Sequence, residues 1–336
     1  MQTIPAPSLK GNLLGDAAEQ EIAIYLPPSY DKSKKNYPVI YFLTGYGDGT
    51  SVAYPLLRDS LDKHTNDGSL KEMIAVTASG VNRLDGSFYV NSPITGNWED
   101  FIFKDVVGYV DAHYRTIPKA GGRGIAGHSM GGFGALNLAM RHPDVFGSVY
   151  SLSPGLFDPD GLANSQMFAT QDAVDSFLKA ESTLASMPKE EAKAKLASVI
   201  GRNWDLEFAL AYGAAFSPNP AKNPPYINYP YRQAGGQPIL DKEVWKVWDS
   251  GFGGIPAKLK LYKQNLLSLK GIVIDYGTHD EYQWIPQGCR YFSQQMDAEK
   301  IPNKLVSFEG GHQDQLRQRI EKFMLPYFSE KLIFEN

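Results

Sequence analysis

The stretch that decides the fold is residues 124–141, GIAGHSMGGFGALNLAMR. Gly124 to Ala126 form a short apolar run that predicts a buried strand, and Met130 to Arg141 has the apolar spacing of a helix. Between them, Gly127 to Gly131 reads G-x-S-x-G, the pattern of a sharp turn that exposes a serine at its tip. The stretch therefore predicts a strand, a tight turn and a helix.

Ser129 stands at the tip of this turn and is the candidate nucleophile. Such a turn strains the serine backbone, and side chains on the flanking positions would collide with the neighbouring strand and helix, which explains Gly127, Gly131 and Gly132. The first amides of the helix point at the same place, so we expect the N–H group of Met130 to stabilise an oxyanion. The alternative is a glycine-rich turn with an incidental serine, which the strand-turn-helix context disfavours.

A serine hydroxyl becomes a good nucleophile only with a base within hydrogen-bond reach. Of the six histidines, His312 follows two glycines directly after the last predicted strand and opens the last helix, where such a hydrolase needs a loop-borne imidazole. We therefore predict His312 as the base, with an ordinary surface-loop histidine as the alternative. The other histidines lie in N-terminal helical segments, inside the serine turn or beside a candidate acid: His64, His113, His142, His128 and His279.

A carboxylate must orient the base, and the chain order serine, acid, histidine places it just after the predicted strand Gly271 to Tyr276. Three carboxylates compete there. Asp275 lies within the strand pattern, whereas Asp280 and Glu281 lie in the following loop. We favour Asp280 over Glu281, because aspartate is the commoner acid in such triads.

A second amide is needed to hold a tetrahedral oxyanion, and it is expected from the loop after an early strand. Here that loop is Thr44 to Gly47. Its glycines allow the backbone to approach a substrate closely. We expect the N–H group of Tyr46 to be the second donor, with an ordinary glycine turn as the alternative.

Apolar runs alternate with helical patterns along much of the chain, which is typical of a mostly parallel sheet covered by helices on both faces. The predicted strands are Ile22 to Leu26, Pro38 to Thr44, Met73 to Ala78, Gly124 to Ala126, Ser148 to Leu152, Gly271 to Tyr276 and Lys304 to Phe308. The predicted helices are Asp100 to Tyr114, Met130 to Arg141, Ile285 to Ala298 and Gln313 to Phe328. We therefore expect an α/β fold.

The alternation stops between residues 154 and 269, where no good core strand is found. We interpret this segment as an inserted cap or lid on a core formed by residues 1–153 and 270–336. Pro188 is expected to divide residues 170–199 into two helices, and the proline-rich residues 217–256 are expected to form an extended, packed loop region.

Several blocks of the sequence resemble the esterase D-like group of α/β-hydrolases, which includes feruloyl esterases, S-formylglutathione hydrolases, enterochelin-type esterases and mycolyltransferases. The blocks are YLPPSY (25–30), YPVIYFLTGYG (37–47), SFYVNSPITGNWEDF (87–101), HYRT (113–116), GHSMGGFGAL (127–136), RHPDVFG (141–147) and GGH (310–312). The resemblance implies an α/β-hydrolase fold. It also places the family's nucleophile, acid and base at Ser129, Asp280 and His312, and its oxyanion amides at Tyr46 and Met130.

Four aromatic residues are candidates for substrate binding. Tyr226, Trp245 and Trp248 lie in the second half of the insertion, where they either line an acyl or aryl pocket or form the small core that lets the insertion fold. Trp98 lies in a loop expected at the carboxyl edge of the sheet, where α/β folds bind ligands, and it either anchors that loop or contacts substrate.

Composition argues against several classes of function. The 336 residues carry a formal net charge of −4 without a clustered basic face, so nucleic acid is not an expected partner. Cys289 is the only cysteine and no metal-ligand cluster is found, so neither a metal nor an organic cofactor is expected. No stretch has the length of a membrane span. We expect a soluble protein, either cytoplasmic or, with its signal peptide removed, periplasmic or secreted; a homo-oligomer is left open.

These residues predict a serine carboxylic ester hydrolase that acts through an acyl-enzyme on small acyl or aryl esters, including feruloyl-like ones. An acyltransferase or a thioesterase of the S-formylglutathione hydrolase type would use the same triad. A non-catalytic binding module on a hydrolase scaffold is a further alternative, which the complete triad disfavours.

Overall fold

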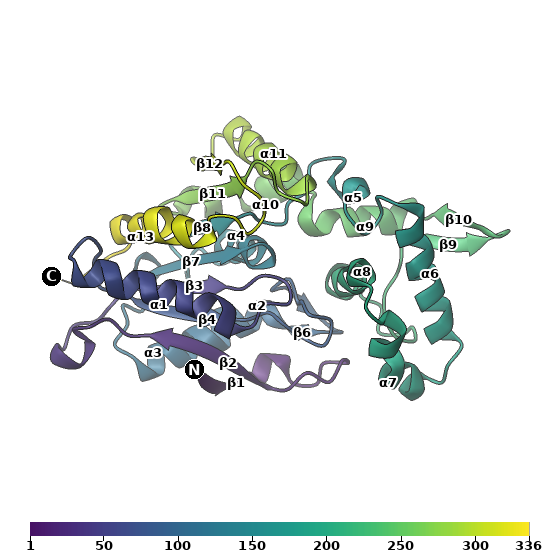
Figure 1. The fold of residues 1–336 in the computed structure, drawn as a ribbon, viewed down its shortest axis with the longest axis horizontal. Helices are drawn as coiled ribbons and strands as arrows, with labels where there is room; N and C mark the ends of the chain where they lie inside the picture. Colours follow the sequence, from purple (N-terminus) through teal and green to yellow (C-terminus); the bar gives the residue numbers. More distant parts are fainter. Residues whose placement is uncertain (336) are drawn as a thin grey trace.

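The computed structural model describes residues 1–335 and has an eight-stranded sheet at its centre, in the order β1-β2-β4-β3-β7-β8-β11-β12 (Figure 1). The β1/β2 and β2/β4 pairs are antiparallel, and the other neighbours are parallel. The mostly parallel sheet is therefore confirmed. Its strands are β1 (Gln2–Pro5), β2 (Glu19–Tyr25), β3 (Val39–Leu43), β4 (Ile74–Ala78), β7 (Arg123–His128), β8 (Ser148–Leu152), β11 (Ile272–Gly277) and β12 (Lys304–Phe308).

Helices cover both faces of this sheet, as its buried, apolar central strands require. On one face lie α1 (Thr50–Asn66) and α13 (Leu325–Lys331), whose apolar residues pack with Ile40, Phe42 and Ala126. On the other face lie α3 (Val107–His113), α4 (Met130–Arg141) and α11 (Trp284–Ala298), which pack around alternate residues of the same strands.

Two predicted helices are divided by π-helical turns. The helix expected from Asp100 to Tyr114 consists of α2 (Trp98–Asp100), η3 (Phe101–Val106) and α3. The last helix begins later than expected, after Gln315, whose φ of 56° lies in the left-handed region. It then runs through α12 (Leu316–Arg319), η5 (Ile320–Met324) and α13.

The chain between β8 and β11 contributes no strand to the main sheet, as expected. Much of it lies at one end of the molecule (Figure 1). Pro188 separates α6 from α7, as predicted. The elements are α5 (Gly161–Asn164), α6 (Gln171–Ala185), α7 (Lys189–Ile200), α8 (Trp204–Phe216), β9 (Tyr231–Ala234), β10 (Gln237–Leu240), α9 (Lys242–Phe252) and α10 (Ile255–Ser268).

The expectation of an extended loop over residues 217–256 is wrong. This region holds the β9/β10 hairpin and α9, which begins where the Asp241 side chain accepts hydrogen bonds from the N–H groups of Glu243 and Val244. The capped helix contains no proline, because it lies in the stretch between Pro238 and Pro256. α10 in turn packs against α4 of the core.

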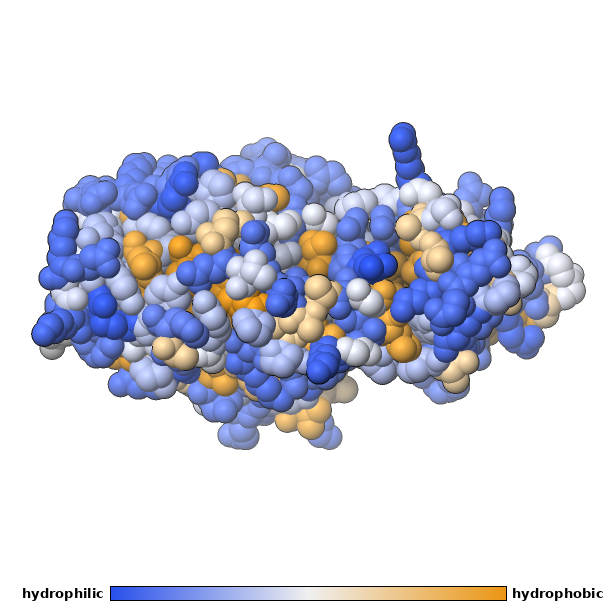
Figure 2. All heavy atoms as spheres, turned by 90° about the horizontal axis from the view of Figure 1, so that it is seen from below, coloured by the Kyte–Doolittle hydropathy of each residue, from blue (hydrophilic) through white to orange (hydrophobic). Residues whose placement is uncertain are grey.

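Within residues 1–335, no helix combines the length and the apolar character needed to cross a bilayer. On the face drawn in Figure 2, polar and charged residues predominate, and apolar residues appear in smaller patches among them.

Candidate active site

Ser129 occupies a strained turn between β7 and α4. Its φ of 57° and ψ of −117° are rare for a residue with a side chain. A Cβ atom on Gly127 or Gly131 would overlap backbone atoms of Gly131 or Leu43, and one on Gly132 would lie 2.7 Å from the carbonyl oxygen of Leu152. The glycines therefore permit the close strand-helix contact that leaves the serine half-exposed at the end of β7.

His312 and Asp280 form a close polar pair in the site. Nδ1 of His312 lies 2.6 Å from Oδ2 of Asp280, and both side chains are buried. The other carboxylate oxygen accepts the N–H group of Tyr282 at 2.9 Å, which fixes the orientation of Asp280. Because a carboxylate accepts the hydrogen of Nδ1, Nε2 of the neutral imidazole carries a free lone pair.

The backbone of His312 is held from two sides. Its carbonyl lies 2.9 Å from Nε2 of His128, and its N–H group donates to Glu281 at 2.8 Å. Burial lowers the pKa of His128 to about 3, so this residue is neutral at physiological pH. The hydrogen bond that Glu281 accepts from the N–H group of His312 lowers the pKa of the Glu281 carboxyl group. The ring, the carbonyl and the amide of His312 thus each have a partner.

The other candidate acids serve other partners. Asp275 lies within β11 and accepts two hydrogen bonds from Arg319, at 2.9 and 2.6 Å, and one from Tyr150. Glu281 contacts the backbone of His312, not its ring. The structure therefore brings Asp280, and neither competitor, to the imidazole.

Three of the other histidines considered as the base have partners away from this site. His64 lies against Ser69 and Glu321, His113 against the carbonyl of Tyr109, and His142 against Glu99.

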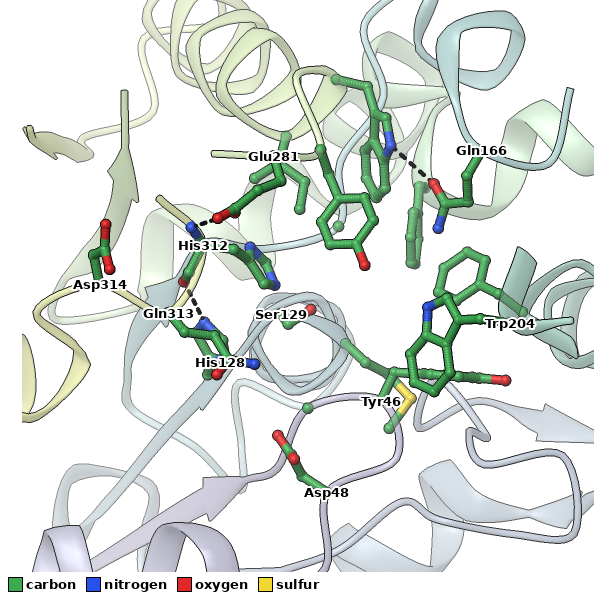
Figure 3. Close-up of a pocket in the computed structure, with 18 residues that line it drawn as sticks. Tyr46, Asp48, His128, Ser129, Gln166, Trp204, Glu281, His312, Gln313 and Asp314 are labelled. Carbon is green, nitrogen blue, oxygen red and sulfur yellow. Dashed lines mark hydrogen bonds between the residues drawn. The ribbon is translucent and has the colours of Figure 1, made fainter. Parts of the chain in front are cut away.

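Ser129 and His312 line one pocket, and the imidazole points toward the serine (Figure 3). Within residues 1–335, no hydrogen bond joins the Ser129 hydroxyl to the ring. Such bonds are often long without substrate and shorten when substrate binds. The arrangement thus supplies a hydroxyl, an imidazole with a free lone pair and a buried carboxylate in the order that acyl transfer requires.

Tyr46 and Met130 border the same pocket. Met130 is the first residue of α4, so its N–H group has no acceptor within the helix. The N–H group of Tyr46 has no hydrogen-bond partner in residues 1–335. Its loop is fixed by hydrogen bonds from the N–H group of Gly47 to Asp85, at 2.8 Å, and from the Thr44 hydroxyl to the carbonyl of Asp48, at 2.6 Å. Two donors are thus available at one cavity.

The pocket has a volume of about 340 Å³, at the lower end of the range of small-molecule sites. Figure 3 shows that its two sides differ: Trp204 and Gln166 lie on one side of Ser129, and Asp48, Gln313 and Asp314 lie on the other. We call these the aromatic side and the polar side. The aromatic rings that line the pocket are those of Tyr46, Trp204, Phe208, Phe252, Tyr282 and Trp284.

The four aromatic residues predicted to bind substrate are not among the lining residues, and the structure corrects this expectation. Trp98 and Trp248 are fully buried, with their indole N–H groups bonded to the carbonyls of Thr95 and Asn228 at 2.8 Å. Tyr226 is buried as well. Trp245 packs against Phe168, with ring centroids 5.0 Å apart. These residues form cores, which was the alternative interpretation.

Most residues of the aromatic side were not predicted from the sequence. Trp204 is 45% exposed, directly after Asn203, whose side chain caps α8. Its ring meets that of Tyr46 edge-on at 5.0 Å. The sequence shows that Trp204 follows a residue suited to cap a helix within the insertion. It does not show that the side chain is exposed, so Trp204 could not be assigned to the pocket from sequence. Trp284 and Tyr282 follow Asp280 closely, and their proximity to the acid could have drawn attention to them.

Within residues 1–335, no group of three or more histidine, cysteine or carboxylate side chains is arranged to hold a metal ion.

The chain is similar in sequence to known esterases. The sequence matches the putative esterase family over residues 17–316. It is 32% identical to an esterase of Mycobacterium tuberculosis over 136 residues, which are 39% of this chain and 28% of that protein. The matched part of the chain therefore covers less than a third of the length of this relative.

Solved structures show the same fold. A ferulic acid esterase superimposes with a TM-score of 0.59 and 21% identity, covering 98% of this chain and 97% of that chain. An S-formylglutathione hydrolase from Agrobacterium tumefaciens superimposes with a TM-score of 0.59 and 13% identity, covering 99% and 94%. The predicted α/β-hydrolase fold is confirmed. With the family match covering most of its length, the chain belongs to the putative esterase family.

Proposed function

We propose that this protein is a serine carboxylic ester hydrolase in which Ser129 is the nucleophile, His312 the base and Asp280 its orienting acid. The observation that carries the proposal is the 2.6 Å contact between Asp280 and Nδ1 of His312, which leaves Nε2 free on the side of a strained, accessible serine. A buried acid on one ring nitrogen raises the basicity of the other and fixes the tautomer.

The reaction proceeds in two steps. Oγ of Ser129 attacks the ester carbonyl while Nε2 of His312 takes the hydroxyl proton. The oxyanion is stabilised by the N–H groups of Tyr46 and Met130. His312 then gives its proton to the departing alcohol. Water attacks the acyl-enzyme with His312 again as base, which releases the acid and returns the proton to Ser129.

The two sides of the pocket suit the two parts of an ester. Planar rings on the aromatic side favour an apolar or aryl acyl group, whereas Asp48, Gln313 and Asp314 on the polar side suit a hydroxyl-bearing alcohol. Burial raises the pKa of Asp48. We infer an ester of a small aryl acid, of the type named in the ferulic acid esterase to which the fold is similar.

The carboxylates that line the pocket argue against the thioesterase alternative. Glutathione carries two carboxylates and one ammonium group and is therefore net negative, which disfavours a pocket lined by Asp48, Glu281 and Asp314. An acyltransferase would share the acyl-enzyme and differ only in the acceptor, so analysis of products formed with added alcohols or sugars separates it from a hydrolase.

We further infer that residues 154–269 act as a lid that shapes the substrate site. Gln166, Trp204, Phe208 and Phe252 belong to this segment and line the pocket beside residues of the core. Contact between the Trp204 and Tyr46 rings supports a lid that reaches the proposed oxyanion loop.

The test is hydrolysis of an ester panel, from p-nitrophenyl acetate to aryl esters, by the wild type and by Ser129→Ala. We expect loss of turnover and of fluorophosphonate labelling in Ser129→Ala with an unchanged circular dichroism spectrum. Turnover retained by Ser129→Ala would refute the mechanism, and absence of both turnover and labelling in the wild type would support a non-catalytic binding module.

A further inference from the structure

Gln166 is a polar residue on the aromatic side of the pocket, half-buried and close to the ring system that would receive the acyl group. Its Oε1 atom accepts a hydrogen bond from the indole N–H group of Trp284 at 3.1 Å. Trp284 is itself 4% exposed and stacks on Phe252, with ring centroids 5.8 Å apart.

This contact fixes which end of the amide faces the cavity. An indole N–H group only donates, so it selects the carbonyl oxygen of the amide and turns the NH₂ group away. Figure 3 shows the amide nitrogen of Gln166 directed into the pocket. Within residues 1–335, this nitrogen has no hydrogen-bond partner. The aromatic side therefore contains an oriented donor whose acceptor must come from a ligand or from water.

We propose that Gln166, oriented by Trp284, is a specificity-determining residue that selects acyl groups carrying a hydrogen-bond acceptor at the end remote from the ester. The proposal rests on the hydrolase function proposed above. The chemical class it names is an aryl acyl group with an ether or hydroxyl oxygen on its ring. An alkyl substituent of equal size would exclude water from the NH₂ group without supplying a hydrogen-bond acceptor in its place.

The expected selectivity follows from whether the acyl group supplies an acceptor to the Gln166 NH₂ group or leaves this donor unpaired. Leaving a partly buried donor unpaired costs more than the net gain of making the bond, and a discrimination of roughly tenfold in kcat/KM is expected. Trp284 acts as a positioning residue, because without its N–H group the amide can rotate and present its oxygen to the cavity.

The experiment compares isosteric substrates, the methyl esters of 4-methoxycinnamate and 4-ethylcinnamate, together with the corresponding benzoates as shorter acyl groups. The wild type is expected to prefer the methoxy compound roughly tenfold in kcat/KM, and Gln166→Leu is expected to bring the ratio close to one. Because each ratio is taken within one variant, a general loss of activity cancels.

Gln166→Glu provides the matched control, because a carboxylate still accepts the Trp284 N–H group but presents an acceptor to the cavity. It is expected to disfavour the 4-methoxy ester and to prefer the 4-hydroxy ester, which can donate. Trp284→Phe keeps a ring and removes the donor, and it is expected to reduce the methoxy preference without reversing it.

The outcomes separate the two proposals. A wild type that hydrolyses all the esters with equal kcat/KM for methoxy and ethyl compounds refutes the role of Gln166 and leaves the hydrolase function standing. A wild type that hydrolyses no ester, including p-nitrophenyl acetate, refutes both. A methoxy preference that survives in both Gln166→Leu and Gln166→Glu assigns the selectivity to another residue and also refutes this role.

Discussion

Nε2 of His128 donates a hydrogen bond to the backbone carbonyl of His312 at 2.9 Å, so the residue before the proposed nucleophile holds the proposed base. The two residues are 184 positions apart in the chain. A carbonyl oxygen only accepts, so Nε2 of His128 must carry the hydrogen. The loop of the base is thereby tied to the strand that carries the serine.

Replacing His128 with Phe should reduce turnover more than substrate binding. Phenylalanine fills a similar volume but leaves the His312 carbonyl without its buried donor, which costs about 1–3 kcal/mol. We expect the imidazole loop to shift and kcat to fall roughly 10- to 100-fold with KM nearly unchanged, because small displacements of a catalytic group are costly. Steady-state kinetics on an aryl ester measure both constants.

The control for this change is His128→Gln, whose amide can still donate to the same carbonyl. It should recover part of the lost kcat. Equal kcat values for the wild type and His128→Phe would show that the hydrogen bond does not position the base.

The stability of the protein should depend on pH through His128. Its pKa is about 3 in the folded state, mainly because of burial, against 6.5 for the ordinary side chain. Between these values the unfolded chain binds a proton that the folded chain does not, so the free energy of unfolding falls as pH decreases from about 6.5 to about 3. From pH 7.5 to pH 5, His128 alone accounts for a loss of roughly 2 kcal/mol.

Urea unfolding at both pH values checks this. His128→Phe should show a pH-dependent loss smaller by that amount, whereas His113→Asn, at an exposed position, should behave as the wild type. An identical pH dependence in His128→Phe and the wild type would mean that His128 titrates normally.

Asp280 and Glu281 both contact His312, yet their replacement should have very different effects. Asp280→Asn keeps the shape but favours the wrong tautomer of the imidazole, and kcat should fall by about 10³- to 10⁴-fold. Glu281→Gln keeps an oxygen that can accept the His312 N–H group, so its loss of kcat should stay below about tenfold. A larger effect at Glu281 than at Asp280, measured on the same ester, would reverse the assignment.

The fold was predictable from sequence where local signals and long-range packing agree. The strands Ser148–Leu152 and Lys304–Phe308 and the helix Met130–Arg141 have the predicted bounds. β1 was missed because it is short, ends at Pro5 and owes its strand conformation to pairing with β2. α1 was missed because Pro55 lies inside the helix, where proline usually interrupts a helical pattern.

The site was predictable only where a residue must occupy a special backbone position. Ser129 and His312 stand beside glycines that the turns require, which made them visible in sequence. The residues that line the pocket need no special backbone conformation, because any side chain at a suitable point of the insertion can line it. Trp204 and Trp248 have the same chemistry and lie in neighbouring helices, yet one is 45% exposed at the pocket and the other is fully buried. Tertiary packing alone separates them.

Gly131, the last residue of the turn that carries Ser129, should not tolerate a single added methyl group. A Cβ atom at Gly131 would overlap the backbone carbonyl of Leu43, which cannot move without breaking β3 from the sheet. We therefore expect Gly131→Ala to lower the free energy of unfolding by about 3 kcal/mol or more. Urea unfolding followed by circular dichroism measures the change.

Gly108 provides the matched control for this substitution. It lies on the exposed side of α3, and a Cβ atom there would have no neighbour within 4 Å. Gly108→Ala should stabilise the protein by roughly 0.5–1 kcal/mol, because alanine loses less backbone entropy than glycine in a helix. The same methyl group is thus expected to act in opposite directions at the two positions, and equal effects at Gly131 and Gly108 would contradict the close approach of α4 to β3.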